Sequence, residues 1–309
     1  EISLLGPTSL GLNLVALGLD WRPGDEVVYC REDYPANVYP WAALENLGVA
    51  PVPLHSPVLG AIAWEDVEAA LTPRTRLVAL ASCHFLSGYR IDVDGIGRRL
   101  HDRGILFCLD AIQTLGAFPL SVEHVDFLSA DSHKWLLGPC GAGIFYVKTA
   151  CRERLRPALV GSWNVVSPQF VAQDAIQFET GGRRYEPGIL NIPGIAGMLA
   201  SMRLLLDIGI DAIGQRLLEL RGALVDRLRP LGYQPLLDAD TPDADRHLSG
   251  IVSVSHPTRD LAAIVRELDA GGVSVSLRHN RLGQAFIRFS PHFYNTDEEI
   301  DRAIALMQS

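Results

Sequence analysis

The sequence predicts an α/β protein, in which a mostly parallel seven-stranded sheet carries helices on both faces and is followed by a small C-terminal α+β domain. Two observations support this fold class. Short apolar runs typical of buried strands alternate with helical segments through the first two-thirds of the chain, which is the pattern of a parallel sheet. A long amphipathic stretch then separates this part from a shorter mixture of strands and helices.

The elements of the first part follow one another in chain order. The strand-like runs are residues 2–5, 26–30, 52–55, 77–82, 106–110, 125–130 and 143–148. Helical segments are expected at residues 10–19, 38–47, 64–71 and 94–103. In folds of this kind, ligands bind at the carboxyl ends of the strands. Residues that directly follow the apolar runs are therefore the first candidates for a site.

The second part begins near Gly194. Residues 195–231 are amphipathic with an interruption near Gly209, and we expect them to form a connecting helical region. The remaining elements are strand-like residues 250–255, 273–277 and 285–290 and helical residues 261–270 and 297–307. We therefore expect a large domain of residues 1–200 and a second unit of residues 201–309.

The composition argues against several classes of partner. The 309 residues are 48% hydrophobic and carry a net charge of −9, with no stripe of Lys and Arg, so nucleic acid is not expected to bind. No apolar run approaches the ~18 residues of a membrane helix. The five cysteines are widely spaced without a C-x-x-C pair, which disfavours a disulfide framework and a zinc site and fits a reducing cytoplasm. We expect a cytoplasmic protein without a metal site.

Lys134 is the most informative residue. It follows an apolar run that ends at Leu128, has His133 and Trp135 as neighbours, and precedes a glycine-rich loop at residues 138–143. A lysine held among apolar residues and opposite a carboxylate is what an enzyme needs to form a Schiff base with pyridoxal 5'-phosphate (PLP). The alternative is an ordinary surface lysine.

Asp110 supplies the expected carboxylate. It ends the apolar run 105–109, so its side chain should emerge at the ligand edge of the sheet. There it could pair with a protonated pyridine nitrogen and keep the PLP ring electron-accepting. A helix cap is the alternative role, but the separation from Lys134 leaves room for a helix, a strand and a turn, which favours the pairing.

Residues 6–13 form a candidate phosphate site. Thr8 and Ser9 place two hydroxyl groups at the start of an apolar helix, where free backbone N–H groups and the helix dipole attract an anion. Helix caps use the same residue types everywhere, so this signal depends on Lys134 and Asp110.

Together these motifs resemble the class V aminotransferase family of fold-type I PLP enzymes, which includes cysteine desulfurases, cysteine lyases, isopenicillin N epimerase and kynureninase. The resemblance covers the whole chain. Its motifs are Thr8-Ser9, residues 34–41, Asp110 with Gln113, residues 132–135, residues 186–191 and residues 287–296. It also leads us to expect that relatives carry a further segment before the position of Glu1.

The resemblance implies a role for each matching residue in binding the cofactor. Lys134 would bear the Schiff base and shuttle protons, Asp110 would hold the pyridine nitrogen, and Gln113 would hydrogen-bond the phenolic oxygen. The remaining cofactor-binding residues would be Thr8, Ser9, Ser132 and His133 around the phosphate, and Tyr34 stacked over the ring. His84 could face the cofactor, although a structural histidine is the commoner case.

Substrate binding is implied for two arginines. Arg288 matches the residue that grips the substrate α-carboxylate, for which a bidentate guanidinium is well suited. Arg278 is available nearby in the C-terminal strands for a carboxylate as well.

The chain also departs from the family pattern. Residues 271–288 contain no cysteine, where cysteine desulfurases carry a nucleophilic one, so we expect that the protein is not a cysteine desulfurase. Asp131 and Ile189 stand where relatives have hydroxyl side chains, so phosphate binding could be weaker or differently arranged.

We therefore expect a homodimeric PLP enzyme acting at Cα of an α-amino acid. An aminotransferase with a 2-oxo acid acceptor comes first, because two arginines are available for carboxylates and no extra nucleophile is present. A C–S lyase for cysteine-type or cystine-type substrates and an amino-acid epimerase are the alternatives. A non-catalytic scaffold that retains the fold is a further alternative, although it would need neither Lys134 nor Asp110.

Overall fold

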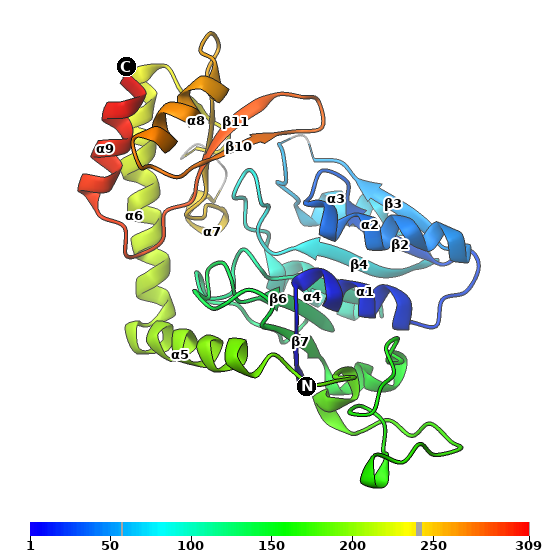
Figure 1. Cartoon of the computed structure of the whole chain (residues 1–309). Coiled ribbons are helices and arrows are strands. Elements are labelled where there is room, and N and C mark those ends of the chain that lie inside the picture. Colours follow the sequence, from blue (N-terminus) through cyan, green and yellow to red (C-terminus); the bar gives the residue numbers. More distant parts are fainter. Residues whose placement is uncertain (57, 239–242, 309) are drawn as a thin grey trace.

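The computed structural model describes residues 1–56, 58–238 and 243–308, which fold around two sheets (Figure 1). The larger sheet has seven strands and the smaller one four. This confirms the predicted fold class. None of the helices in the described ranges combines the length and the apolar character that crossing a membrane requires.

The large sheet has the strand order β1-β7-β6-β5-β4-β2-β3. Its strands are β1 (Ile2–Leu5), β2 (Glu26–Cys30), β3 (Ala50–Leu54), β4 (Thr75–Ala81), β5 (Leu106–Asp110), β6 (Phe127–Asp131) and β7 (Gly143–Val147). Strands β2 to β6 pair in parallel, whereas β7 runs antiparallel to both of its neighbours. The carboxyl ends of β2, β4, β5 and β6 therefore meet at one edge of the sheet.

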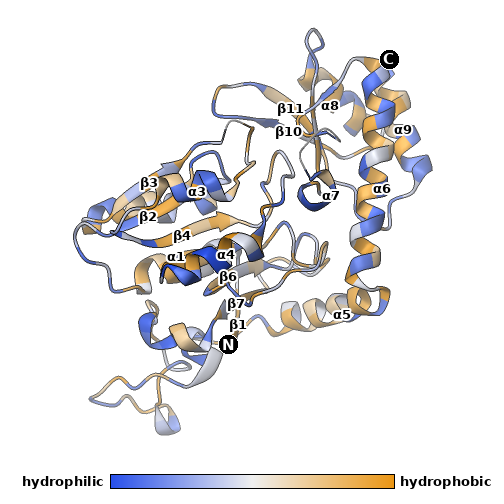
Figure 2. Ribbon diagram, turned by 180° about the vertical axis from the view of Figure 1, so that it is seen from behind, coloured by the Kyte–Doolittle hydropathy of each residue, from blue (hydrophilic) through white to orange (hydrophobic). Residues whose placement is uncertain are grey.

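Alternating side chains of the strands build one hydrophobic core on each face. Leu77 and Cys108 face one core, while their neighbours Val78 and Phe107 face the other. A strand directs successive side chains to opposite faces, so a strand buried on both faces is apolar throughout. Strand β4 is accordingly coloured largely hydrophobic in Figure 2.

Helices cover both faces of this sheet. They are α1 (Thr8–Gly18), α2 (Tyr39–Ala42), α3 (Trp64–Ala70) and α4 (Val93–Asp102). Leu12 and Trp41 pack into one core, and Val67 and Ile96 into the other. The single helix expected at residues 38–47 is instead the short α2 flanked by 3-10 turns, and Pro40 near its start cannot donate a helical hydrogen bond.

Two successive helices, α5 (Ile192–Ile208) and α6 (Ile210–Leu228), lead to the small sheet. They meet at Gly209, whose φ of 93° is unfavourable for residues with a side chain and ends α5. Figure 1 shows that the chain changes direction between the two helices. The expected domain boundary between residues 200 and 201 falls inside α5, and the division at that point stays a prediction.

The small sheet is antiparallel, with the order β10-β11-β9-β8. Its strands are β8 (Gln234–Pro235), β9 (Val252–Ser255), β10 (Ser276–His279) and β11 (Ala285–Phe289), and its helices are α7 (Ala244–His247), α8 (Leu261–Ala270) and α9 (Asp297–Gln308). Val252, Ile287 and Phe289 pack with α6, α8 and α9 into a separate core.

The other face of the small sheet contacts the large domain. Ser253 Oγ donates to the carbonyl of Leu86, and Nη1 of Arg288 donates to the carbonyl of Phe85 at 2.7 Å. Because Ser253 and Arg288 are cross-strand neighbours, the polar side chains of this face point toward the carboxyl edge of the large sheet.

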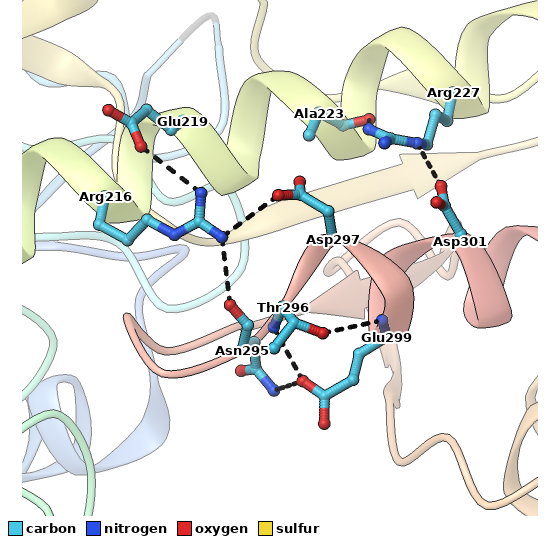
Figure 3. Close-up of polar contacts among 9 residues, drawn as sticks. All are labelled: Arg216, Glu219, Ala223, Arg227, Asn295, Thr296, Asp297, Glu299 and Asp301. Carbon is cyan, nitrogen blue, oxygen red and sulfur yellow. Dashed lines mark hydrogen bonds and ion pairs between the residues drawn. The ribbon is translucent and has the colours of Figure 1, made fainter.

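Charged contacts join α6 to α9 at the surface (Figure 3). Arg216 lies 3.5 Å from Asp297, and Nε of Arg227 donates to Asp301 at 2.7 Å. Thr296 caps α9 by accepting from the backbone of Glu299. These contacts fix α9 against the connecting helix, which helps hold the small sheet in place.

Candidate active site

The candidate site lies where the carboxyl edge of the large sheet meets the polar face of the small one. Asp110 ends β5, and Lys134 follows β6 after a short turn. Neighbouring parallel strands end side by side, so the two side chains come together although 23 residues separate them along the chain. Lys134 and Asp110 each affect the pKa of the other, and their roles at this edge stay a prediction.

Lys134 is half-buried in a mixed electrostatic environment. Its Nζ lies 5.6 Å from the centre of the Tyr34 ring. The pKa of Lys134 is lowered, mainly by burial and further by Arg288 and Arg278, while Asp110 and Asp33 act in the opposite direction. A lower pKa provides more of the neutral amine, which is the nucleophilic form.

Asp110 is buried, and its Oδ1 accepts a hydrogen bond from the backbone N–H of Ile112 at 2.9 Å. Burial raises the pKa of Asp110 to about 7, and Asp33 adds to the effect while Lys134 opposes it. A cation beside this carboxylate would favour its ionised form. Asp110 is therefore suited to a protonated ring nitrogen.

Asp33 is a second carboxylate at the site, and the sequence analysis missed it. Its oxygens accept from the backbone N–H of Tyr34 at 2.7 Å and from Nδ2 of Asn37 at 2.9 Å. Burial raises the pKa of Asp33 to about 6, although Lys134 lowers it. Asp33 follows β2 just as Asp110 ends β5, and this position after a buried strand could have identified it.

Gln113 is oriented by Trp135. Nε1 of the Trp135 indole donates to Oε1 of Gln113 at 2.9 Å, and both side chains are buried. Because an indole can only donate, the amide oxygen must face Trp135 and the amide NH₂ must face away from it. In the described part of the chain this NH₂ group has no acceptor. It can therefore donate to an oxygen of a bound molecule.

The N-terminus of α1 and the end of β6 form the candidate phosphate site. The backbone N–H of Asp131 donates to Oγ1 of Thr8 at 2.9 Å, which leaves the Thr8 hydroxyl proton for another acceptor. Ser9 begins the same helix turn. Nδ1 of His133 lies 3.0 Å from Oδ2 of Asp131. Ser132 instead donates its hydroxyl to the carbonyl of Pro139, so it has no proton left for a phosphate.

Asp131 itself is unusual, because its Oδ1 is buried without a hydrogen-bond partner. A carboxylate at a phosphate site repels the anion unless a cation or a proton lies between them. Nδ1 of His133 contacts the other oxygen of this carboxylate, Oδ2. Ile189 lies outside this arrangement in the chain described here, with 83% of its surface exposed.

Arg278 and Arg288 come from the small sheet. Arg288 pairs with Ser276, and Arg278 pairs with Phe286, so both arginines lie on the face of the sheet that is turned to the large domain. Nε of each arginine is buried without a hydrogen-bond partner. Both are therefore available to an anionic ligand.

Tyr34 and His84 differ in whether their side chains are free to contact a bound cofactor. Tyr34 is 46% exposed and packs edge-to-face on Phe85. His84 is buried, and its ring nitrogens contact Ser87 Oγ and the carbonyl of Glu32, both at 3.1 Å. Burial lowers the pKa of His84 to about 4. The structure thus places His84 in a structural role, with neither nitrogen left for a cofactor.

The residues present fit PLP. Lys134 offers an amine of lowered pKa, Asp110 a buried carboxylate without a strong cationic partner, and Gln113 an oriented NH₂ group. The hydroxyl of Thr8 and the imidazole of His133 belong to the candidate phosphate site. This is the distribution of donors and charges that the aldehyde, the ring nitrogen, the phenolic oxygen and the phosphate require.

Comparisons with known proteins show to which family the chain belongs. The family model for class V aminotransferases matches residues 2–303. A probable cysteine desulfurase of Methanothermobacter thermautotrophicus is 31% identical over 97% of this chain and 76% of its own length. The apo structure of a cysteine desulfurase from Thermococcus onnurineus NA1 is 26% identical, with a TM-score of 0.91, and covers all of this chain and 78% of its own. A cystine C–S lyase in complex with its product cysteine persulfide shares the fold, with a TM-score of 0.87 at 24% identity over 98% of this chain and 80% of its own.

These relatives overturn one expectation. The exclusion of a cysteine desulfurase was wrong, because relatives that match nearly the whole chain carry that name. The exclusion rested only on the absence of a cysteine from residues 271–288. Cys140, the one exposed cysteine of the five, lies instead on the loop after Lys134. From the match across residues 2–303 and the shared fold, it follows that this chain belongs to the class V aminotransferase family.

Proposed function

We propose that this protein cleaves the C–S bond of a cysteine-type amino acid with PLP as its cofactor. The observation that supports the proposal is the electrostatic coupling of Lys134 to two groups, because Asp110 raises the pKa of Lys134 and Arg288 lowers it. The names of the relatives favour sulfur chemistry over the transamination that the sequence analysis put first.

Each residue has a defined task in this reaction. When bound, PLP supplies an electron sink for the pair that remains when Cα loses its proton. Arg288 holds the substrate α-carboxylate and so fixes which Cα bond can break. The Lys134 amine takes the Cα proton, and Asp110 as an anion stabilises positive charge at the ring nitrogen.

The reaction then completes by elimination. The Cβ–S bond breaks, its electron pair leaves with sulfur, and a Cα=Cβ double bond forms from the electrons of the former Cα–H bond. Hydrolysis of the resulting enamine gives a 2-oxo acid and ammonia. No external oxidant or amino acceptor is consumed, which distinguishes this reaction from transamination.

We further propose that the enzyme is a homodimer. Exposed apolar side chains follow one another along α5 and the segment before it, including Ile189, Ile192, Leu199 and Leu206. Patches of this kind on a soluble surface are typical of protein interfaces. Sedimentation at several concentrations measures the mass; a monomer at all of them contradicts this part of the proposal.

Product analysis tests the reaction. Purified protein loaded with PLP is incubated with L-cysteine or L-cystine, with and without a 2-oxo acid, and the products are identified by mass spectrometry. Sulfur release together with a 2-oxo acid and ammonia, independent of the acceptor, is the expected result. Products that require the acceptor would establish transamination instead.

Lys134→Ala is the matched control. It should reduce turnover by roughly 10³-fold or more, because it removes the proton-transfer group, and it should abolish the visible absorbance band of the lysine–cofactor bond. With L-cystine, whose elimination releases a persulfide, the mass of the protein after reaction shows in addition whether the outer sulfur is passed to Cys140, with Cys140→Ser as the reference.

A further inference from the structure

Trp135, the residue that follows Lys134, is contacted from two sides. Its indole Nε1 donates to Gln113 after β5. Its backbone carbonyl oxygen lies 3.1 Å from Nε2 of His292, in a buried contact. His292 belongs to the segment 290–296, which leads from β11 of the small sheet to α9. The neighbour of the reactive lysine thus touches both parts of the molecule.

The position of the His292 proton follows from the contacts of its ring. Nδ1 accepts from the backbone N–H of Phe293 at 2.9 Å, so in the neutral ring the proton lies on Nε2. Burial lowers the pKa of His292, although the contact with Trp135 acts in the opposite direction, and the ring is therefore neutral at pH 7. Nε2 of His292 is thus the donor to the Trp135 carbonyl.

His292 is itself fixed by its own segment. Its ring stacks on Tyr294, with the centroids 5.2 Å apart and the planes 7° apart. Its backbone N–H donates to Oδ1 of Asn295 at 2.8 Å. The Asn295 amide in turn donates to Glu299 of α9 at 2.9 Å (Figure 3). The donor to Trp135 is therefore tied to a helix of the small sheet.

The turn that carries Lys134 is strained. The backbone N–H of Leu137 donates to the carbonyl of Lys134 at 3.0 Å, which closes a turn over residues 134–137. Leu137 has a φ of 56°, in the left-handed region that is unfavourable for a residue with a side chain. Strain of this kind persists only where surrounding contacts hold it.

The Trp135 carbonyl lies within this turn and is closely surrounded. A Cβ atom on Gly116 would lie 2.7 Å from its oxygen. Among the residues that the structure describes, His292 provides the one hydrogen-bond donor to this oxygen. A buried carbonyl without a donor is unfavourable, so loss of the His292 donor would favour another conformation of the turn.

We propose that His292 is a positioning residue for Lys134 and Gln113. By donating to the Trp135 carbonyl, it holds the strained turn in the conformation that directs the Lys134 amine and, through the Trp135 indole, the Gln113 amide toward the cofactor. This rests on the proposed function and adds to it a residue of the small sheet's segment that acts through Trp135.

The visible absorbance band of the PLP-loaded protein tests the inference before any substrate is added. His292→Leu removes the donor, so Trp135 should orient Gln113 less well. The pKa of the phenolic oxygen, read from the pH dependence of the band, should then rise by about half a unit or more. His292→Gln keeps an amide N–H at the position of Nε2 and should restore the wild-type pKa. An unchanged pKa in His292→Leu overturns the inference.

Kinetics separate positioning from substrate binding. In His292→Leu, kcat for the amino acid substrate should fall by about ten-fold or more, because the Lys134 amine is misplaced. KM should change by less than about two-fold, since Arg288 keeps its hydrogen bond to Phe85. An unchanged kcat, or a loss confined to KM, contradicts the positioning role.

His256 provides the matched control. Its Nδ1 also accepts from nearby backbone N–H groups, those of Thr258 and Arg259, but its ring packs on Tyr233 rather than on Trp135. His256→Leu should keep the wild-type kcat and the pKa of the band. An equal shift in His256→Leu would reflect a general loosening of the small sheet and overturns the inference.

A second variant covers the case in which His292→Leu does not fold. His292→Asn keeps a polar side chain, but its amide is too short to reach the Trp135 carbonyl. The pKa of the band and kcat should change in His292→Asn as in His292→Leu, and wild-type values in this variant overturn the inference.

These measurements separate the two proposals. The band is read without substrate, so its shift in His292→Leu can be present even if product analysis shows transamination. Conversely, C–S cleavage together with a normal His292→Leu variant leaves the proposed function intact and removes only the role of His292. A wild-type protein that forms no visible band with PLP contradicts both.

Discussion

The two halves of the site differ in how completely the protein satisfies its own polar groups. At the edge of the large sheet, Thr8, Asp110 and Gln113 all have protein partners that fix their orientation. On the face of the small sheet, Arg278 and Arg288 have no acidic partner in the described ranges and keep unpaired buried nitrogens. The polar groups at the edge of the large sheet are thus preorganised, as a permanently bound cofactor requires. Those on the small sheet keep free donors, as a substrate that binds and dissociates requires.

The largest effect is expected on the substrate side. Arg288→Gln should lower kcat/KM for the amino acid substrate by about 10²-fold, because a charged bidentate hydrogen bond is lost. PLP content, read from the visible absorbance, should change little. An equal loss of PLP would erase the distinction between the two halves and give Arg288 a part in holding the cofactor.

Asp110 tests the cofactor side through pH. The pKa of Asp110 is about 7 in the folded protein against a usual value of 3.8, so folding favours its protonated form. That contribution to stability is complete below the unfolded-state pKa and is lost as pH rises through about 7. Relative to Asp110→Asn, the cofactor-free wild type should therefore lose stability between pH 4 and 7, on the order of 3 kcal/mol.

Denaturant unfolding at pH 5 and pH 8 measures this difference, and Asp174→Asn, at an exposed position, controls for the loss of one charge. A difference between wild type and Asp110→Asn that does not vary with pH would mean that Asp110 is ionised in the same way in both states. The cofactor half would then be less desolvated than its geometry implies.

Trp135 tests orientation within the cofactor half. Trp135→Phe removes the N–H that fixes the Gln113 amide, so donation from the NH₂ group to the phenolic oxygen should weaken. Such a donor stabilises negative charge on the phenolic oxygen. The pKa of this oxygen, read from the pH dependence of the visible band, should therefore rise by about one unit in Trp135→Phe. Gln113→Leu should shift it at least as far. A shift with Gln113→Leu alone would show that Gln113 holds its orientation without Trp135.

The smallest effect is expected at the α6–α9 contact. Arg227→Ala should cost less than about 1 kcal/mol of unfolding free energy, because Asp301 is largely exposed, Arg227 is partly exposed and solvent screens their attraction. Substrate kinetics should stay as in the wild type. A change in KM would mean that the position of the small sheet, and with it Arg288, depends on this surface contact.

Sequence periodicity sufficed for the fold and for the residues on strand ends. Asp110 and Lys134 could be found because each follows an apolar run, and Arg288 because it lies in a recognisable strand. Asp33 follows the same rule, but it also resembles an ordinary loop aspartate beside Pro35 and Ala36, and only its burial reveals it.

Other features needed three dimensions. His84 stands after a strand as a cofactor residue would, yet hydrogen bonds to Ser87 and to the Glu32 carbonyl occupy its ring. The donor from Trp135 to Gln113 joins residues 22 apart and has no sequence pattern. The exclusion of a cysteine desulfurase was wrong because it rested on a single absent cysteine, whereas relatives of that name match nearly the whole chain.

The hydrogen bond from Arg288 to the carbonyl of Phe85 adds a structural contact to the proposed substrate-binding role of this side chain. The guanidinium joins the small sheet to the large domain, and it is also the group that we propose to hold the substrate carboxylate. Any movement of the small sheet relative to the large domain must move this guanidinium as well. The affinity for the amino acid and the angle between these two parts of the molecule are therefore coupled.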